Sequence, residues 1–414
     1  MTTPGAPVTP GSRLARLLGS RGILTDPLWH RAIIAVDRTA FVPDTLYGSD
    51  PAHPGWECPV PRTDPRWDAW VQEDYALATQ VDDGHPQGEH GRGRLVTSSL
   101  SQPSLVVAML QALDAREGHR VLEIGTGAGY NTALLCHALS DRAVVSVEID
   151  RDLAKTAIGN LARAGYAPTV LDDDGISDPF AGVAMGRFHR LLATVAARGR
   201  VPYSWVRQLY PGGVLVTPWE VGNTPGVLLR LEVEEGHAAH GRIIGDASFM
   251  VLRSHRSDRR SAMEVVNEES PGAVDATTSV NPRLVAYRNQ GWQLVLGHLV
   301  PELRYAVYEA AEDRPECAGE ASVYVATPQD GSWALGEYVP AGGPYRVKRE
   351  GARDLWAAVG AAWEVWERAG RPGRDRLGVT VDERGTHLWA DGPEGVLQLD
   401  GDGRSGRRAP AGTG

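Results

Sequence analysis

A glycine-rich turn follows a short apolar run at residues 120–130, which read "RVLEIGTGAGY". Because glycine has no Cβ, such a turn lets the backbone lie directly against a ligand. A turn of this kind after a strand can bind one of three ligands: a triphosphate, a dinucleotide or an adenosyl group. A triphosphate-binding loop needs Lys and then Ser or Thr after its last glycine, and Tyr130 and Asn131 provide neither. The dinucleotide pattern GxGxxG is weakened as well, since Gly129 comes one residue too early.

Acidic residues at the ends of two later strand-like runs favour the adenosyl group. The run "VVSVEID" supplies Glu148, 23 residues after Gly125, where an acceptor for ribose hydroxyls is expected. The run "VLDDDGI" supplies Asp174, which could receive an adenine amino group. Carboxyl ends of parallel strands meet at one edge of a sheet, where open α/β folds bind ligands. The alternative is that these acids are only solvated strand ends, which their ordered spacing disfavours.

The turn itself resembles the GxGxG turn of class I methyltransferases, which bind S-adenosyl-L-methionine. Glu123, the acidic residue before the first glycine, fits the same pattern. The resemblance implies S-adenosyl-L-methionine as the cofactor. The residues expected to bind it are Glu123, Gly125, Thr126, Gly127, Gly129, Glu148, Ile149, Asp174 and Gly175.

The segment "TSSLSQPSLVVAMLQAL" before the turn offers hydroxyl groups. Ser99 and Ser101 can hydrogen-bond a ligand beside the glycine turn and fix its direction. Ser101 could instead cap the helix that Pro103 begins, or do both. Four further residues are candidates for contact with a substrate, the two arginines as partners of an acidic peptide or as parts of a solvated loop. They are Leu100, Gln102, Arg92 and Arg94.

Strand-like and helical runs alternate between Arg120 and about Pro218, which predicts an α/β fold with a mostly parallel sheet. In this pattern, "PTVLDDDG" is expected to form a strand and "RFHRLLATVA" the helix that follows it. Two short helices are expected upstream, from Arg13 onward. Residues 48–94 show little periodicity and are expected to form a functional or surface-wrapping loop. After Trp219, "GVLLRLEVEEG", "GRIIGD" and "ASFMVLRS" indicate antiparallel strands.

These runs predict two domains, flanked by a tail at each end of the chain. Residues 13–225 would form the cofactor-binding domain, and residues 226–402 a smaller mixed α+β domain with a role in substrate recognition. The tails 1–12 and 403–414 are expected to be disordered. In the second domain, Trp356, Trp363 and Trp366 share one face of a predicted helix, a spacing more typical of packing than of a binding platform.

Charge and residue composition argue against several classes of function. The formal net charge of −10 argues against a nucleic-acid binder. The three cysteines lie far apart and form no CxxC, and His85, His90, His237 and His240 lack the context of metal ligands, so neither disulfides nor a metal are expected. The absence of a signal-like start or an apolar run long enough to cross a bilayer favours a cytoplasmic protein with no membrane contact.

Residues 13–220 resemble the protein-L-isoaspartate O-methyltransferase family, which methylates a carboxylate of an aspartyl or isoaspartyl residue in a peptide. The resemblance rests on "AFVP", "SQPSLVVAMLQAL", "RVLEIGTGAGY" and "QLYPGGVLVTP". It implies a Rossmann-like class I methyltransferase fold and places Ser101 at the methyl-transfer site, with Ser99 and Leu100 lining the same pocket. Because the acceptor oxygen is already anionic at pH 7, no strong general base is needed.

The chain departs from the repair enzymes in its extended C-terminal part and in "SSLSQP", where the family has Thr-Ile-Ser-Gln-Pro. With "LVTPW" and "FMVLR", these features are similar to those of methyltransferases associated with ribosomally made, modified peptides. That resemblance implies methylation of an aspartate in a cyclised precursor, followed by closure to an aspartimide. Isoaspartyl repair is the alternative, and a non-catalytic cofactor-binding protein is the second alternative. The sequence identifies neither the peptide nor the oligomeric state.

Overall fold

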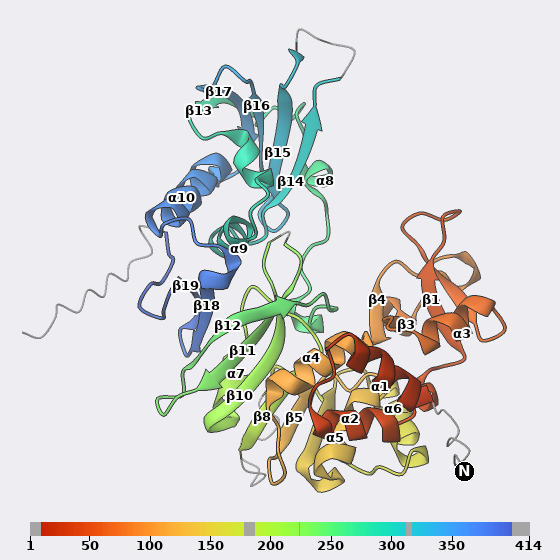
Figure 1. The fold of residues 1–414 in the computed structure, drawn as a ribbon. Helices are drawn as coiled ribbons and strands as arrows, with labels where there is room; N and C mark the ends of the chain where they lie inside the picture. Colours follow the sequence, from red (N-terminus) through yellow and green to blue (C-terminus); the bar gives the residue numbers. More distant parts are fainter. Residues whose placement is uncertain (1–9, 178–186, 223, 312–316, 400–414) are drawn as a thin grey trace, which may run out of the picture. The chain divides into compact units, whose positions relative to one another are not determined.

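The computed structural model describes residues 10–177, 187–222, 224–311 and 317–399. The chain forms two compact units (Figure 1). The first comprises the residues up to Glu220, together with Pro225–Arg256 and Thr380–Thr386. The second comprises Val221–Thr224, Ser257–Val379 and the residues from His387 onward. The first unit thus continues to Arg256, beyond the domain boundary expected at residue 225, because the antiparallel strands after Trp219 extend its sheet.

The first unit is built on a sheet whose parallel part runs in the order β10-β8-β5-β6-β7. β11 and β12 extend it antiparallel to β10, and the tip of the β18–β19 hairpin follows β12. β5 and β6 are buried at every position, which explains their nearly continuous apolar sequences. The strands are β5 (Val121–Ile124), β6 (Val144–Glu148), β7 (Thr169–Asp172), β8 (Phe188–Ala193), β9 (Ala197–Arg198), β10 (Leu209–Glu220), β11 (Val227–Val233), β12 (Ala239–Asp246), β18 (Leu377–Asp382) and β19 (Gly385–Ala390). The expected α/β fold is confirmed, although the sheet as a whole is mixed and only the part from β10 to β7 is parallel.

Helices of the first unit begin where the sequence supplies caps. Asp26 caps α2 and Asp150 caps α6, each through a side-chain oxygen that accepts backbone N–H groups. α4 packs on β8 and β10, whereas α5 and α6 pack on β6. These helices are α1 (Pro10–Ser20), α2 (Pro27–Ala35), α4 (Pro103–Leu113), α5 (Tyr130–Leu139), α6 (Arg151–Arg163) and α7 (Tyr203–Arg207).

The expected disorder of residues 1–12 is wrong for its last three residues, because α1 begins at Pro10 and proline suits a first helical turn. Residues 1–9, and the C-terminal tail expected at 403–414, lie outside the described residues.

Residues 48–94 contain strands rather than a long loop. A four-stranded antiparallel sheet in the order β2-β1-β3-β4 occupies this region, and Figure 1 shows its strands grouped with α3 (Pro65–Gln72). Its strands are β1 (Thr45–Ser49), β2 (Glu57–Pro61), β3 (Leu77–Val81) and β4 (Val96–Leu100). Each strand has only five residues, and β2 contains two prolines, so the alternation was too short to detect.

Two other expectations from periodicity were wrong. "RFHRLLATVA" is not helical: Phe188–Ala193 form β8 within the parallel sheet, between β10 and β5. Because its last residues are buried on both faces, they show no apolar–polar alternation that would indicate a strand. "ASFMVLRS" is not a strand, and only Val251 makes an isolated bridge, to Ala196. The segment then enters a short 3-10 helix at Arg253–His255.

The second unit has an antiparallel sheet in the order β13-β17-β16-β15-β14. Trp292, Trp333, Trp356 and Trp366 are fully buried in this unit, and the Trp363 ring lies 4.9 Å from those of both Trp292 and Trp366. The expected packing role of the helical tryptophans is therefore confirmed. The elements are α8 (Ala262–Val265), α9 (Gln290–Leu299), α10 (Leu355–Arg368), β13 (Val274–Thr278), β14 (Arg304–Glu309), β15 (Ala321–Thr327), β16 (Ser332–Tyr338) and β17 (Tyr345–Glu350).

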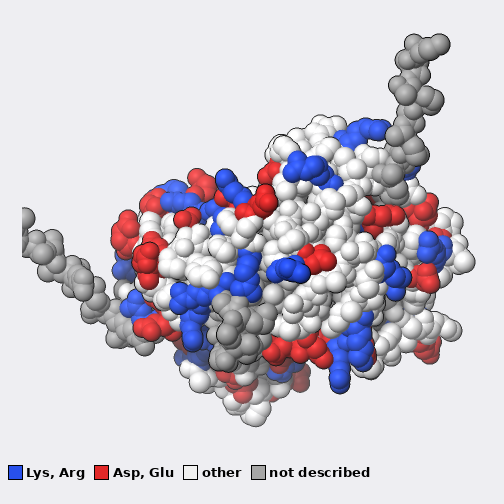
Figure 2. All heavy atoms as spheres, turned by 90° about the horizontal axis from the view of Figure 1, so that it is seen from below, with Lys and Arg blue, Asp and Glu red and all other residues white. Residues whose placement is uncertain are grey.

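Acidic and basic side chains are interspersed on the face drawn in Figure 2. Cys58, Cys136 and Cys317 are not joined in disulfide bonds. Of the helices in the described part of the chain, none combines the length and the apolar character needed to cross a lipid bilayer.

Candidate functional site

A pocket of about 1050 Å³, counting its open mouth, lies in the first unit at the carboxyl ends of β5 and β6. The end of β4 and the segment 250–256 complete its walls. Most of the predicted site residues line this pocket. They are Ser99, Leu100, Ser101, Gly125, Thr126, Gly127, Glu148, Ile149, Asp174 and Gly175.

The glycine turn forms the floor of the pocket. Gly125, Gly127 and Gly129 have φ angles of 95°, 54° and 94°, a region that favours glycine. A Cβ on Gly125 would lie 2.7 Å from Thr194 Oγ1, whose hydroxyl donates to the carbonyl oxygen of Gly125 at 2.6 Å. Gly129 serves a different purpose: it lies outside the pocket lining, precedes α5 and packs against Leu161. Two of the three glycines therefore shape the pocket, and the third seats a helix.

Glu148 ends β6 with its side chain at the pocket. One carboxylate oxygen accepts the N–H of Gly127 at 2.9 Å, and the other accepts the N–H of Asp150 at 3.0 Å. The residue is only 8% exposed, and this burial raises the pKa of its carboxyl group, with the two N–H donors opposing the shift. Each oxygen retains a further lone pair for a hydroxyl donor.

Asp174 and Gly175 follow β7 and line the same pocket. The carbonyl of Gly175 accepts the indole N–H of Trp205 at 2.6 Å, which fixes this turn against α7. A Cβ on Gly175 would meet Ile124 Cγ2 at 2.5 Å, so this wall of the pocket also depends on glycine.

Glu123 does not line the pocket, although the sequence predicted contact with the cofactor. Its side chain is fully buried below the turn. It accepts hydrogen bonds from Thr132, Ser146 and Asn131 at 2.5–2.6 Å. Burial raises the pKa of Glu123 and these donors oppose the shift. Its role is to hold the residues under the glycine turn, one of which, Asn131, does reach the pocket.

The hydroxyls of Ser99 and Ser101 have no hydrogen-bond partner among the described residues. The helix cap that could have occupied Ser101 is supplied elsewhere: a carboxylate oxygen of Asp74 accepts the N–H of Ser104 at 2.8 Å. The N-cap position of α4 is Gln102, and its side chain makes no capping bond. Both serine hydroxyls are therefore available to a ligand in the pocket.

Three residues predicted to contact substrate do not line the pocket. Gln102 donates its side-chain N–H to Asp74 at 3.4 Å. Arg92 binds the carbonyl of Glu89 at 3.0 Å, and the Arg94 guanidinium lies 4.4 Å from the centre of the Trp56 ring. The structure gives both arginines partners within their own loop and strand region rather than a place at the site.

Instead, two other arginines line the pocket, Arg253 and Arg256. Arg256 forms a two-pronged ion pair with Asp83, and Arg253 pairs with Asp83 at 3.0 Å and with Asp150 at 3.3 Å. The guanidinium of Arg256 holds the pKa of Asp83 below its ordinary value. The motif "FMVLR" drew attention to this segment of the sequence. It gave no indication that Arg256 would bind Asp83, 173 residues away.

The combined features suit an adenosyl group. The glycine turn leaves room for close approach, Glu148 offers carboxylate oxygens for vicinal hydroxyls, and Asp174 lies in the same pocket. Apolar side chains supply surface for a flat ring system. These side chains are those of Val106, Met109, Ile124, Val147 and Leu153.

Residues 69–256 match the model of the family described as "Protein-L-isoaspartate(D-aspartate) O-methyltransferase". A protein-L-isoaspartate O-methyltransferase from Methanopyrus kandleri is 34% identical over 194 residues, which are 44% of this chain and 80% of that protein. The chain belongs to the protein-L-isoaspartate O-methyltransferase family. Enzymes of this family use S-adenosyl-L-methionine as the methyl donor, in agreement with the pocket.

Coverage differs among the relatives. Protein-L-isoaspartate O-methyltransferase 2 from Rhodopseudomonas palustris is 39% identical over 135 residues, 32% of this chain and 59% of its own length. The chain thus spans less than two thirds of that relative. A solved structure named protein-L-isoaspartate O-methyltransferase has a TM-score of 0.51 at 18% identity and covers 92% of this chain and 99% of its own. At that identity, the likeness establishes the fold.

Proposed function

We propose that this protein transfers a methyl group from S-adenosyl-L-methionine to the carboxylate of an isoaspartyl residue in a protein or peptide. The observation that carries the proposal is the position of the free hydroxyls of Ser99 and Ser101 in the same pocket as Glu148 and the glycine turn. One group of residues is thereby suited to the donor, and the other to an acceptor carboxylate.

For this reaction the protein has to bind the methyl donor and orient the acceptor oxygen. When bound, S-adenosyl-L-methionine supplies an electrophilic methyl group. Gly125, Gly127 and Glu148 would hold the adenosyl part, and the serine hydroxyls would orient the acceptor oxygen by donating hydrogen bonds. The acceptor is already ionised at pH 7, so no residue has to remove a proton.

The two arginines of the pocket do not oppose this chemistry. A bare guanidinium on the attacking oxygen would lower its nucleophilicity. Arg253 and Arg256 are neutralised by Asp83 and Asp150, at distances of 2.7–3.3 Å. The pocket therefore keeps two cations in its wall without presenting their full charge to an acceptor.

The choice of an isoaspartyl acceptor rests on the relatives, since proteins from several organisms that match this chain carry that name. The extended C-terminal part does not by itself favour a dedicated peptide, because the fold likeness to a protein of the same name covers 92% of this chain. The narrower hypothesis, an aspartate in a ribosomally made, cyclised peptide, remains the competing proposal. Its ester would close when the next backbone nitrogen attacks the carbonyl and expels methanol, giving an aspartimide.

Two peptides of identical sequence, one with aspartate and one with isoaspartate, separate these proposals. The purified chain is incubated with each peptide and S-adenosyl-L-methionine carrying a labelled methyl group, and products are followed by mass spectrometry. We expect a gain of one methyl only on the isoaspartyl peptide. A cyclised precursor peptide with ordinary aspartate forms the third arm. Methylation of that precursor alone, followed by a net loss of one water from the starting mass, would replace our proposal with the narrower hypothesis.

A further inference from the structure

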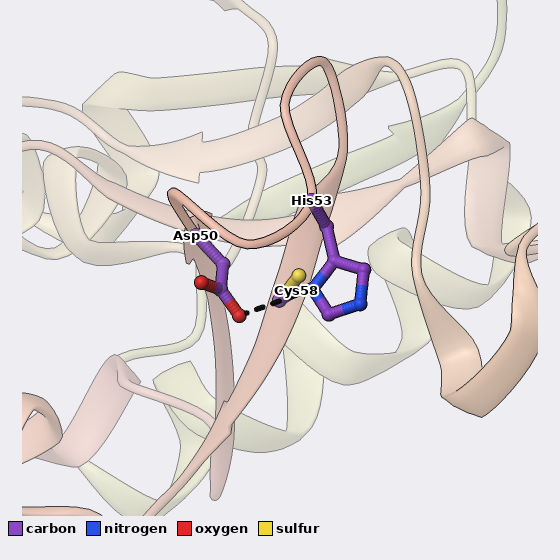
Figure 3. A group of neighbouring side chains, drawn as sticks. All are labelled: Asp50, His53 and Cys58. Atoms are coloured by element: carbon purple, nitrogen blue, oxygen red, sulfur yellow. Dashed lines mark hydrogen bonds and ion pairs between the residues drawn. The ribbon is translucent and has the colours of Figure 1, made fainter.

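Three potential metal ligands of different chemistry meet at the loop end of the β1–β2 hairpin (Figure 3). Asp50 directly follows β1, His53 lies in the connecting turn and Cys58 is the second residue of β2. None of the three lines the cofactor pocket. All three are partly exposed, so an ion from solvent can reach them.

The ligand atoms are already close to one another. Asp50 Oδ2 lies 3.2 Å from His53 Nδ1, and the carboxylate oxygen, the ring nitrogen and the Cys58 sulfur all lie within 4.8 Å of one another. Ligands of a tetrahedral zinc ion, with bond lengths of about 2.0–2.3 Å, are separated by about 3.3–3.7 Å. The separation of Asp50 and His53 lies just below this range, and the Cys58 sulfur lies within 4.8 Å of both ligand atoms.

The turn that carries the ligands is ordered by its own backbone. Asp50 uses one carboxylate oxygen to accept the N–H of Ala52 at 2.9 Å, leaving the other directed at His53. His53 accepts the N–H of Trp56 at 3.1 Å through its carbonyl oxygen. The strand register pairs Gly48 with Cys58, which brings the sulfur back to the level of the turn. Ligands held in this way lose little conformational entropy on binding an ion.

Packing beneath the hairpin adds rigidity. A Cβ on Gly48 would lie 2.5 Å from the Trp70 ring, so α3 contacts β1 at van der Waals distance. Arg66 of the same helix is bound by Asp64, with nitrogen–oxygen distances of 2.9–3.2 Å, yet its charge still reaches Asp50 and Cys58. That cation would repel an incoming ion, and its ion pair with Asp64 reduces this repulsion.

The donor set selects the class of ion. Thiolate and imidazole ligands suit zinc and similar transition metals, whereas magnesium and calcium prefer oxygen alone. A carboxylate and a thiolate together balance a divalent charge. Three protein ligands leave the fourth position of a tetrahedral ion to water, as in open zinc sites.

We propose that Asp50, His53 and Cys58 bind one zinc ion, with water as the fourth ligand. The proposal departs from the expectation that no metal is bound, which was drawn from the cysteine spacing and from four other histidines without the context of metal ligands. It is independent of methyl transfer and joins the hairpin turn to β2.

Titration of the untagged, chelator-treated chain with cobalt(II) and then zinc tests the site. We expect one cobalt per chain, an absorption band from thiolate-to-cobalt charge transfer, and displacement of cobalt by zinc. Zinc should also raise the melting temperature, since an ion that binds only the folded state stabilises it.

Cys58→Ser should abolish the charge-transfer band and weaken zinc binding by at least about 100-fold, beyond the 10- to 100-fold cost typical of losing an outer-shell group. Asp50→Asn and His53→Gln should also weaken binding. Cys317→Ser, which changes the other partly exposed cysteine, should alter neither the band nor the affinity. Circular dichroism of each variant checks folding. Absence of one-to-one binding in the unaltered chain, or equal binding by well-folded Cys58→Ser, overturns the proposal.

Discussion

Arg256 donates two hydrogen bonds to the carboxylate of Asp83, at 2.7 and 3.1 Å, across 173 residues of sequence. Arg256 belongs to the pocket wall, whereas Asp83 precedes β4, the strand that carries Ser99. Asp83 has a left-handed φ of 55°, and its N–H donates to Thr97 at 3.1 Å. This ion pair therefore joins the wall of the pocket to the strand that presents the serine hydroxyls.

Asp83→Asn should loosen the pocket wall, because the amide cannot replace a charge-assisted pair with two arginines. We expect the affinity for S-adenosyl-L-homocysteine, measured by calorimetry, to fall about fivefold or more, corresponding to about 1 kcal/mol. Asp258→Asn breaks a similar two-pronged pair with Arg260 in the second unit and serves as the matched control. Equal losses in both variants would contradict a specific role for Asp83.

Glu148→Gln should weaken binding of the same ligand by roughly 10- to 100-fold, since hydrogen bonds to charged groups contribute about 1.5–3 kcal/mol. pH provides a second readout. Burial raises the pKa of Glu148 above its ordinary value of 4.5, and only the ionised form keeps all its acceptor sites. Affinity should therefore be full above the raised pKa and be lost as pH falls through it. In Glu148→Gln this acidic loss should disappear, and an unchanged pH profile would assign the titration to another group.

Ser101→Ala should lower turnover about five- to tenfold, the effect of losing one hydrogen bond of about 1 kcal/mol at the acceptor. Affinity for S-adenosyl-L-homocysteine should stay within twofold, roughly 0.4 kcal/mol, because the hydroxyl is assigned to the acceptor. Ser101→Thr, which keeps a hydroxyl, should recover part of the turnover. Ser104→Ala changes a serine of α4 outside the pocket lining and is the control. Loss of cofactor affinity in Ser101→Ala would move Ser101 to the donor side.

Gly125→Ala tests the floor of the pocket. Its Cβ would lie 2.7 Å from Thr194 Oγ1, and its φ of 95° disfavours alanine. Gly118 has a similar φ of 86°, but a Cβ there meets no atom within 4 Å. Gly118→Ala therefore measures the backbone cost alone, about 1–2 kcal/mol of stability. Both variants should melt earlier in calorimetry, but only Gly125→Ala should also lose cofactor affinity, by about tenfold or more. Retained affinity would show that Thr194 moves aside.

Some errors in the sequence interpretation have a common physical origin. "RFHRLLATVA" has the composition of either a helix or a buried strand, and only its place between β5 and β10 made it a strand. Glu123 has the position of a cofactor ligand, but three donors from α5 and β6 hold it below the turn. Arg92 and Arg94 lie close to the serines in sequence, yet Arg92 binds Glu89 in its own loop and Arg94 lies over the ring of Trp56, just before β2.

The sequence by itself determined what local chemistry controls. Positive φ angles demanded the glycines at 125 and 127, Asp26 and Asp150 marked helix starts, and strand-end positions brought Glu148 and Asp174 to one edge of a parallel sheet. Only the tertiary structure decided which groups from distant segments meet. The ion pair of Asp83 with Arg256 depends on packing, and the proximity of Asp50 to Cys58 depends on the register of the β1–β2 hairpin. Local sequence patterns encode neither.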